Sequence, residues 1–69
     1  MMSVFSVSSV SAASPVSFQD ALEKGYSRAS STLRGIESIE VIGERANVEA
    51  GAIKEYVVDL KIVFALEKW

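Results

Sequence analysis

The chain has 69 residues, a formal net charge of −2, and neither cysteine nor histidine. This length predicts one domain, residues 1–69, whose single core gives only marginal stability without a staple. The missing cysteines exclude disulfides and thiolate–metal sites, and the missing histidines remove the usual general base and the commonest metal ligand. Seven basic residues against nine acidic ones do not form the clustered positive charge that nucleic acid requires. Self-association remains as the way to stabilise such a chain.

The first 13 residues, MMSVFSVSSVSAA, predict a β-strand because serines are interspersed with valines and a phenylalanine. A secretory signal is the alternative interpretation. It is disfavoured because signal peptides begin with positive charge, and the first basic residue here is Lys24. No run approaches about 18 apolar residues, so no membrane span is predicted. We therefore expect a cytoplasmic protein.

A helix is predicted from about Ser17 to Arg34, after Pro15 has restricted Ser14 to an extended conformation. Ser17 and Asp20 are spaced as a capping pair. Gly35 is positioned to end the helix in a left-handed conformation. Apolar and small residues recur at three- and four-residue spacing along one helix face: Phe18, Ala21, Leu22, Gly25, Ala29 and Leu33.

Two more strands are predicted, at about 36–46 and 52–67, joined by a turn over 47–51. Gly43 predicts a bulge or bend in the first of them. In the last strand every even position from Tyr56 to Leu66 is apolar, and this period of two predicts one face packed on a core. At about 3.3 Å per residue the strand would span about 50 Å.

The odd face of the last strand mixes charged residues with valine and isoleucine. Val57, Val63 and Ile53 predict that this face is partly buried against another subunit. If Ile39 and Val41 share the helix-covered face, five residues are expected together near the middle of the opposite face: Ser38, Glu40, Val57, Asp59 and Lys61.

In order, spacing and length the chain resembles the dodecins, small flavin-binding proteins that assemble as hollow homododecamers. The resemblance covers about Phe5 to Glu67. It rests on Ser14-Pro15 and on four further segments: YSRASSTLR (26–34), IEV (39–41), VEAGAI (48–53) and EYVVDLKIVFALE (55–67). It implies an α+β subunit of β-α-β-β order, in which a three-stranded antiparallel sheet wraps around one helix. It also implies twelve identical chains built from trimers.

The resemblance further implies a flavin site for FMN or riboflavin. The family's stacking tryptophan falls at Ser38 and its flavin-contacting glutamine at Val57. Serine has no π face and valine cannot hydrogen-bond a flavin edge. Stacking of one base on an aromatic side chain is worth about 1–3 kcal/mol, so this departure argues against tight flavin binding. Trp69, the only tryptophan, is out of register with Ser38, and a frayed terminal residue is favoured over a return to the site.

Three functions therefore stay open. The chain binds and stores flavin or another planar molecule, it binds calcium as flavin-free dodecin relatives do, or it assembles without a ligand. Glu40 and Asp59 supply the oxygen ligands that calcium prefers, but salt bridges to Lys61 or Arg45 are an alternative role for these carboxylates. An enzyme is not expected, because no histidine is present to activate a serine nucleophile.

Overall fold

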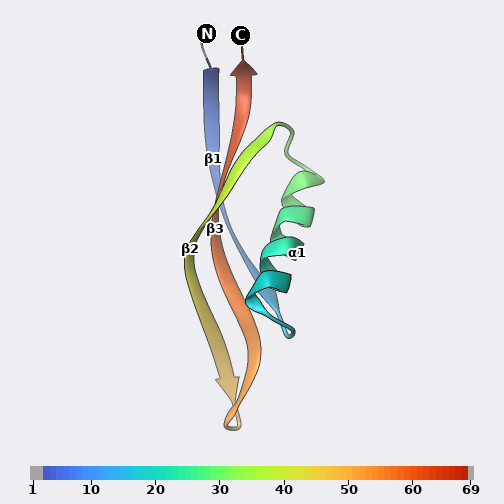
Figure 1. Ribbon diagram of the computed structural model, residues 1–69, viewed down its shortest axis with the longest axis vertical. Helices are drawn as coiled ribbons and strands as arrows, with labels where there is room; N and C mark the ends of the chain where they lie inside the picture. The colour runs from blue at the N-terminus through green and yellow to red at the C-terminus, as the bar shows by residue number, and fades with distance from the viewer. Residues whose placement is uncertain (1–2, 69) are drawn as a thin grey trace.

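The computed structural model describes residues 3–68, with side chains described for residues 3–66. Its elements are β1 (Ser3–Ser14), α1 (Phe18–Ser30), β2 (Ile36–Glu49) and β3 (Ala52–Lys68). All three strands form one antiparallel sheet in the order β1-β3-β2, and α1 lies against one face of it (Figure 1). The predicted β-α-β-β order is thereby confirmed.

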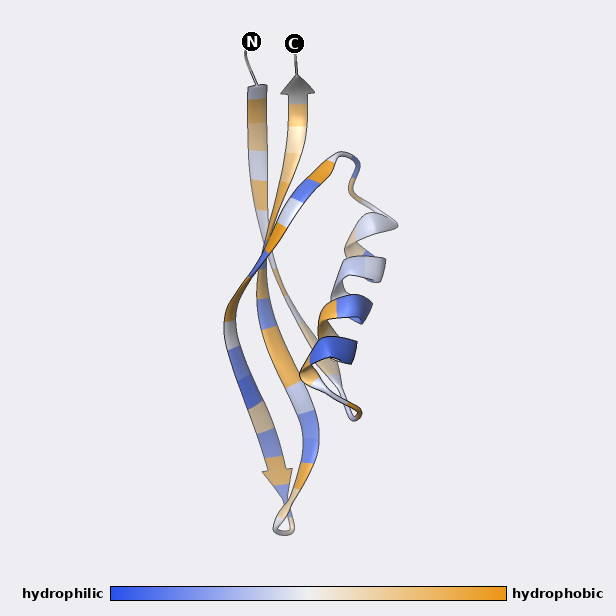
Figure 2. Ribbon diagram, viewed as in Figure 1, coloured by the Kyte–Doolittle hydropathy of each residue, from blue (hydrophilic) through white to orange (hydrophobic). Residues whose placement is uncertain are grey.

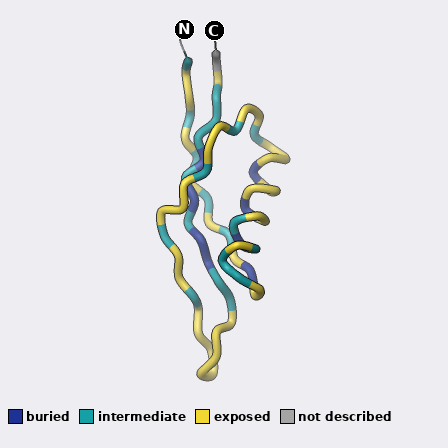
Figure 3. The backbone as a smooth tube through the Cα atoms, viewed as in Figure 1, coloured by how far each residue is buried: buried dark blue, intermediate teal, exposed yellow. Residues whose placement is uncertain are grey.

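The core lies between α1 and the even positions of β3, as the alternation in the sequence predicts. Val58, Leu60 and Ile62 are each 0–1% exposed, and they face the buried helix residues Ala21 and Ala29. Figure 3 shows this burial as a short band in the middle of β3 and along the inner side of α1. A single helix thus covers only the central part of the sheet.

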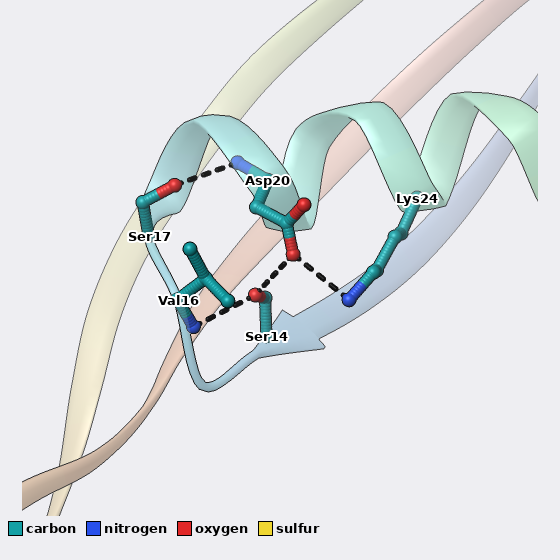
Figure 4. A network of polar contacts seen from close by, with 5 residues as sticks. All are labelled: Ser14, Val16, Ser17, Asp20 and Lys24. Atoms are coloured by element: carbon teal, nitrogen blue, oxygen red, sulfur yellow. Dashed lines mark hydrogen bonds and ion pairs between the residues drawn. The ribbon is translucent and has the colours of Figure 1, made fainter.

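The start of α1 is held to the end of β1 by a small polar network (Figure 4). The predicted cap is confirmed, because the Ser17 hydroxyl accepts a hydrogen bond of 2.9 Å from the backbone N–H of Asp20. The Asp20 carboxylate accepts a hydrogen bond from the buried Ser14 hydroxyl and forms an ion pair of 2.8 Å with Lys24. Ser14 also accepts from the N–H of Val16 at 3.0 Å. The network fixes the angle at which the chain enters the helix.

The predicted end of the helix at Arg34 is wrong, since α1 ends at Ser30 with Ser31 as its C-cap. The hydroxyl of Ser31 donates to the carbonyl of Arg28 at 2.7 Å, and that of Thr32 donates to the carbonyl of Ala29 at 3.3 Å. Such local side-chain hydrogen bonds to backbone carbonyls compete with the backbone hydrogen bonds that would continue the helix. Gly35 does have positive φ, at 72°, but it lies in the link to β2 and its carbonyl accepts from the N–H of Ala65 at 2.8 Å.

The turn before β3 is shorter than predicted, because β2 continues to Glu49. Only Ala50 and Gly51 form the turn, with φ of 52° and 79°. Two consecutive left-handed residues are typical of tight type I′ hairpins. Side chains extend the ladder toward this turn: Asn47 donates to Glu55 at 2.8 Å, and Lys54 pairs with Glu49 at 3.1 Å. The predicted bulge at Gly43 is confirmed by a register shift between Val41 and Gly43.

The molecule is long and thin, with extents of 53 × 20 × 13 Å. The paired ends of β1 and β3 project beyond the helix at one end, and the β2–β3 hairpin projects at the other (Figure 1). Apolar residues continue into both projections (Figure 2). Several large apolar side chains on the strands are consequently exposed: Val4, Phe5, Val7, Val41, Ile42, Val48, Ile53 and Leu66.

Candidate functional site

The sheet face turned away from α1, called here the outer face, carries the residues singled out from the sequence. Strand pairing arranges them in four successive rows across β1, β3 and β2. The rows are Val7–Val63–Ser38, Ser9–Lys61–Glu40, Ser11–Asp59–Gly43 and Ala13–Val57–Arg45. The outer face therefore has two polar rows in the middle and one largely apolar row on either side of them.

Ser38 and Val57 do not lie together within one chain, and the expectation of one central cluster is wrong in this respect. Ser38 pairs with Val63, which is six residues from Val57 along β3, or about 20 Å at 3.3 Å per residue. Ser38 is exposed, whereas Val57 is only 5% exposed. A ligand much shorter than about 20 Å can therefore touch both positions only where they come from different chains.

Asp59 is the centre of a cross-strand polar cluster that sequence reasoning missed in part. The Ser11 hydroxyl donates to Asp59 Oδ1 at 2.6 Å, and Arg45 Nη1 donates to Asp59 Oδ2 at 3.0 Å. These contacts, the Ser11 hydrogen bond first and then the Arg45 charge, lower the pKa of Asp59 despite the opposing effect of its burial. A Cβ at Gly43 would lie 3.2 Å from Asp59 Oδ2, so the glycine leaves room for the carboxylate.

Glu40 lies in the neighbouring row and is bonded differently. Its carboxylate forms an ion pair of 3.4 Å with Lys61, its direct partner across the strands. Diagonal neighbours such as Glu40 and Asp59 lie about 7–8 Å apart in a regular sheet. The salt bridges to Lys61 and Arg45 that the sequence suggested are thus both present. Among the side chains described, those of residues 3–66, no group of three or more acidic side chains is arranged to hold a metal ion.

A second feature, which sequence reasoning missed, is a groove of about 440 Å³ between α1 and β1. Its apolar part is formed by Val10, Ala12, Gly25, Ala29 and Leu33. The signal was present in the sequence as small residues on the inner side of both elements. Finding the groove required knowing that β1 and α1 pack side by side.

Two other predictions concern the ends of the chain and membranes. Trp69 lies outside the described residues, so its interpretation as a frayed terminal residue stays a prediction. In the part of the chain that the structure describes, no helix is long and apolar enough to cross a membrane.

The sequence model of the dodecin family matches residues 4–67, nearly the whole chain. The chain belongs to the dodecin family. A solved dodecin from Streptomyces coelicolor is 33% identical with a TM-score of 0.90, over 97% of this chain and 96% of that one. A solved protein from Thermus thermophilus is 28% identical with a TM-score of 0.89, over 99% of this chain and 100% of that one. The predicted dodecin fold, a sheet wrapped around one helix, is confirmed.

A calcium dodecin from Mycobacterium tuberculosis is also similar in structure to this family member. It is 26% identical with a TM-score of 0.82, over 93% of this chain and 91% of that one. That protein is described as a calcium-chelating antigen with a novel calcium-binding site. No curated protein sequence matches the chain.

Proposed function

We propose that twelve copies of this chain, built from trimers, form a hollow dodecin-type shell that binds a small molecule without catalysing a reaction. The observation that carries the proposal is the uncovered apolar part of the outer face. Val4, Phe5 and Val7 of β1 are 39–56% exposed, and Phe5 and Val7 pair with Ala65 and Val63 of β3. Exposed apolar surface that continues along a sheet marks an interaction site.

Unpaired strand edges support the same proposal. In the order β1-β3-β2, both β1 and β2 are edge strands. β1 has twelve residues, SVFSVSSVSAAS, and none of them is charged or proline. Charges and prolines are the usual means by which an edge strand resists pairing with another chain. An edge without them fits a strand that is covered in an assembly.

The family's flavin site then falls between chains, because Ser38 and Val57 are about 20 Å apart within one chain at 3.3 Å per residue. FMN or riboflavin would meet the Ser38 hydroxyl in place of an indole and the Val57 methyls in place of an amide. Both the stacking contact and the polar contact at the ring edge are lost. Flavin remains the first candidate ligand of the proposed shell because of the family to which the chain belongs. We expect its affinity to be low because both contacts are missing.

Calcium is the second candidate ligand, favoured by the similarity to a calcium-binding dodecin. Glu40 and Asp59 lie in adjacent rows of the outer face and provide carboxylate oxygens. Calcium usually takes six to eight oxygen ligands, so two carboxylates form a site only if a second chain adds more. Binding would also displace Lys61 and Arg45 from these carboxylates.

Native mass spectrometry of protein purified without added ligand tests both candidates. The expected result is a twelve-chain mass with no flavin-sized increment. Adding FMN should produce weak, incomplete occupancy. Adding calcium chloride should produce discrete calcium increments if the second candidate holds, and Glu40→Gln should remove them. A single-chain mass at micromolar concentration would overturn the proposed shell.

A further inference from the structure

The groove between α1 and β1 has an origin that can be read from its side chains. Gly25 of the helix faces Ala12 of the strand, since a Cβ added at Gly25 would lie only 3.1 Å from the Ala12 Cβ. The two elements therefore approach closely at this point. Val10 of β1 and Leu33, which follows α1, line the space beside this contact. The result is an apolar groove of about 440 Å³, a size typical of small-molecule sites.

The charged side chains of the groove suit an anion. Lys24 and Arg28 line it together with Ser8, and no acidic residue does. Ser11 and Thr32 line it too, but their hydroxyls already donate to Asp59 and to the Ala29 carbonyl. This excess of positive charge occurs in a chain whose net charge is −2. Lys24 is already paired with Asp20, whereas none of the ion pairs among residues 3–66 involves Arg28. Arg28 is exposed in the last turn of α1 and is available to a ligand.

We propose that this groove binds an aliphatic amphiphile with an anionic head, such as a medium-chain carboxylate. The aliphatic chain lies over Val10, Ala12 and Leu33, and the carboxylate receives hydrogen bonds from the Arg28 guanidinium. A charged hydrogen bond of this kind is about twice as strong as a neutral one. The residues that line the groove belong to one chain and do not include Ser38, Val57, Glu40 or Asp59, the residues of the proposed flavin and calcium positions.

The test is a titration of dodecanoate into the full chain by isothermal calorimetry, with dodecan-1-ol as the uncharged comparison. Arg28→Gln removes the proposed contact, and Arg34→Gln is the matched control because it removes an equal charge from an exposed residue outside the groove. We expect Arg28→Gln to weaken dodecanoate binding about tenfold and to leave dodecan-1-ol unchanged. Arg34→Gln should bind both ligands as the unaltered chain does.

A second variant, Ser8→Leu, places a larger side chain in the groove and should weaken both ligands. Circular dichroism shows whether this variant is folded. If it is not, the comparison of Arg28→Gln with Arg34→Gln still tests the proposal. Equal dodecanoate affinity in those two variants would overturn the proposal. A second result would also overturn it: the unaltered chain does not bind dodecanoate, and Arg28→Gln, but not Arg34→Gln, loses the oligomer. The groove would then be a contact between copies of the chain. β1 lines the groove, and its free edge is covered in the proposed shell, so the two tests are read separately. A twelve-chain mass without dodecanoate binding would overturn only the groove proposal, and dodecanoate binding by a single chain would overturn only the shell.

Discussion

At the residue scale, the distance between helix and sheet is set by side chains that are small or missing. Ala21, Gly25 and Ala29 are the buried positions of α1, and they are spaced four residues apart. A Cβ on Gly25 would lie 2.8 Å from Leu60 Cδ1, in the middle of the core. Glycine costs about 1 kcal/mol relative to alanine inside a helix, so its presence here follows from packing rather than from helix propensity.

Gly25→Ala should therefore destabilise the chain although alanine is the better helix former. The added methyl must displace the buried Leu60 side chain, and overpacking of this kind costs about 1–3 kcal/mol. After the gain in propensity, the free energy of unfolding should fall by roughly 1–2 kcal/mol. Urea unfolding measures the change. Ser27→Ala, at an exposed position of the same helix, is the control and should not destabilise; a stabilised Gly25→Ala variant would contradict the packing argument.

Ser38 and Val57 are the residues that distinguish this chain from the flavin-binding pattern. Ser38→Trp restores an aromatic face at an exposed position and should raise FMN affinity roughly 5- to 150-fold, the equivalent of about 1–3 kcal/mol per stacking contact. Adding Val57→Gln should raise it further, at some cost in stability because Val57 is buried. Quenching of FMN fluorescence on titration measures both. Unchanged quenching in the double variant would show that these positions do not form the site.

At the scale of the elements, the attachment of α1 to β1 depends on a carboxylate. The hydrogen bond from Lys24, followed by that from Ser14, lowers the pKa of Asp20 below its ordinary value of 3.8. An acid whose pKa is lower in the folded than in the unfolded chain stabilises the fold when it is ionised. This contribution is complete above the unfolded pKa and is lost as the pH falls through the folded one.

We expect Asp20→Asn to be less stable than the unaltered chain from pH 7 down to about pH 4 by a constant difference. Below about pH 4 the difference should shrink, since Asp20 becomes protonated and its advantage disappears. Urea unfolding at a series of pH values measures it. Glu23→Gln makes the same charge change outside the network and should show no such trend. If the stability difference between Asp20→Asn and the unaltered chain were as large at pH 2 as at pH 7, the charge of Asp20 would not be its cause.

At the scale of the whole molecule, one helix cannot cover a sheet as long as this one. The molecule is 53 Å long, and among residues 3–66 the buried apolar side chains are confined to the region that α1 covers and to Val57. Outside that region the strands are supported by their own pairing and by contacts between their side chains, such as those of Asn47 with Glu55 and Lys54 with Glu49. The exposed row formed by Val7, Val63 and Ser38 lies on the outer face, away from the helix. Its apolar part is the surface that we expect a neighbouring chain to cover.

Val63→Asp should accordingly weaken assembly, because an unpaired charge would be buried against the neighbour at a cost of about 3–5 kcal/mol. Size-exclusion chromatography with light scattering should show a mass well below that of the unaltered protein. Val16→Asp, at an exposed valine in the link before α1, is the control and should keep the full mass. A full-size Val63→Asp oligomer would mean that this row is not an interface.

Much of the fold could be predicted from the sequence because it depends on local periodicity. The alternation from Tyr56 to Leu66 predicts which side of β3 is buried, and the Ser17–Asp20 pair predicts where α1 begins. The end of α1 could not be predicted in the same way. Ser31 and Thr32 can either continue the helix or end it by hydrogen-bonding their hydroxyls to backbone carbonyls. The sequence does not show which of these two conformations has the lower free energy.

The tertiary structure alone decided the relations between residues far apart in the chain. Register depends on bulges, such as the one between Val41 and Gly43, and a shift of one residue changes every partner. It therefore took the folded sheet to place Ser38 about 20 Å from Val57, at 3.3 Å per residue, and to bring Ser11 to Asp59. The groove beside Arg28 likewise exists only because α1 packs against β1, and spacing along the sequence does not encode the volume between two packed elements.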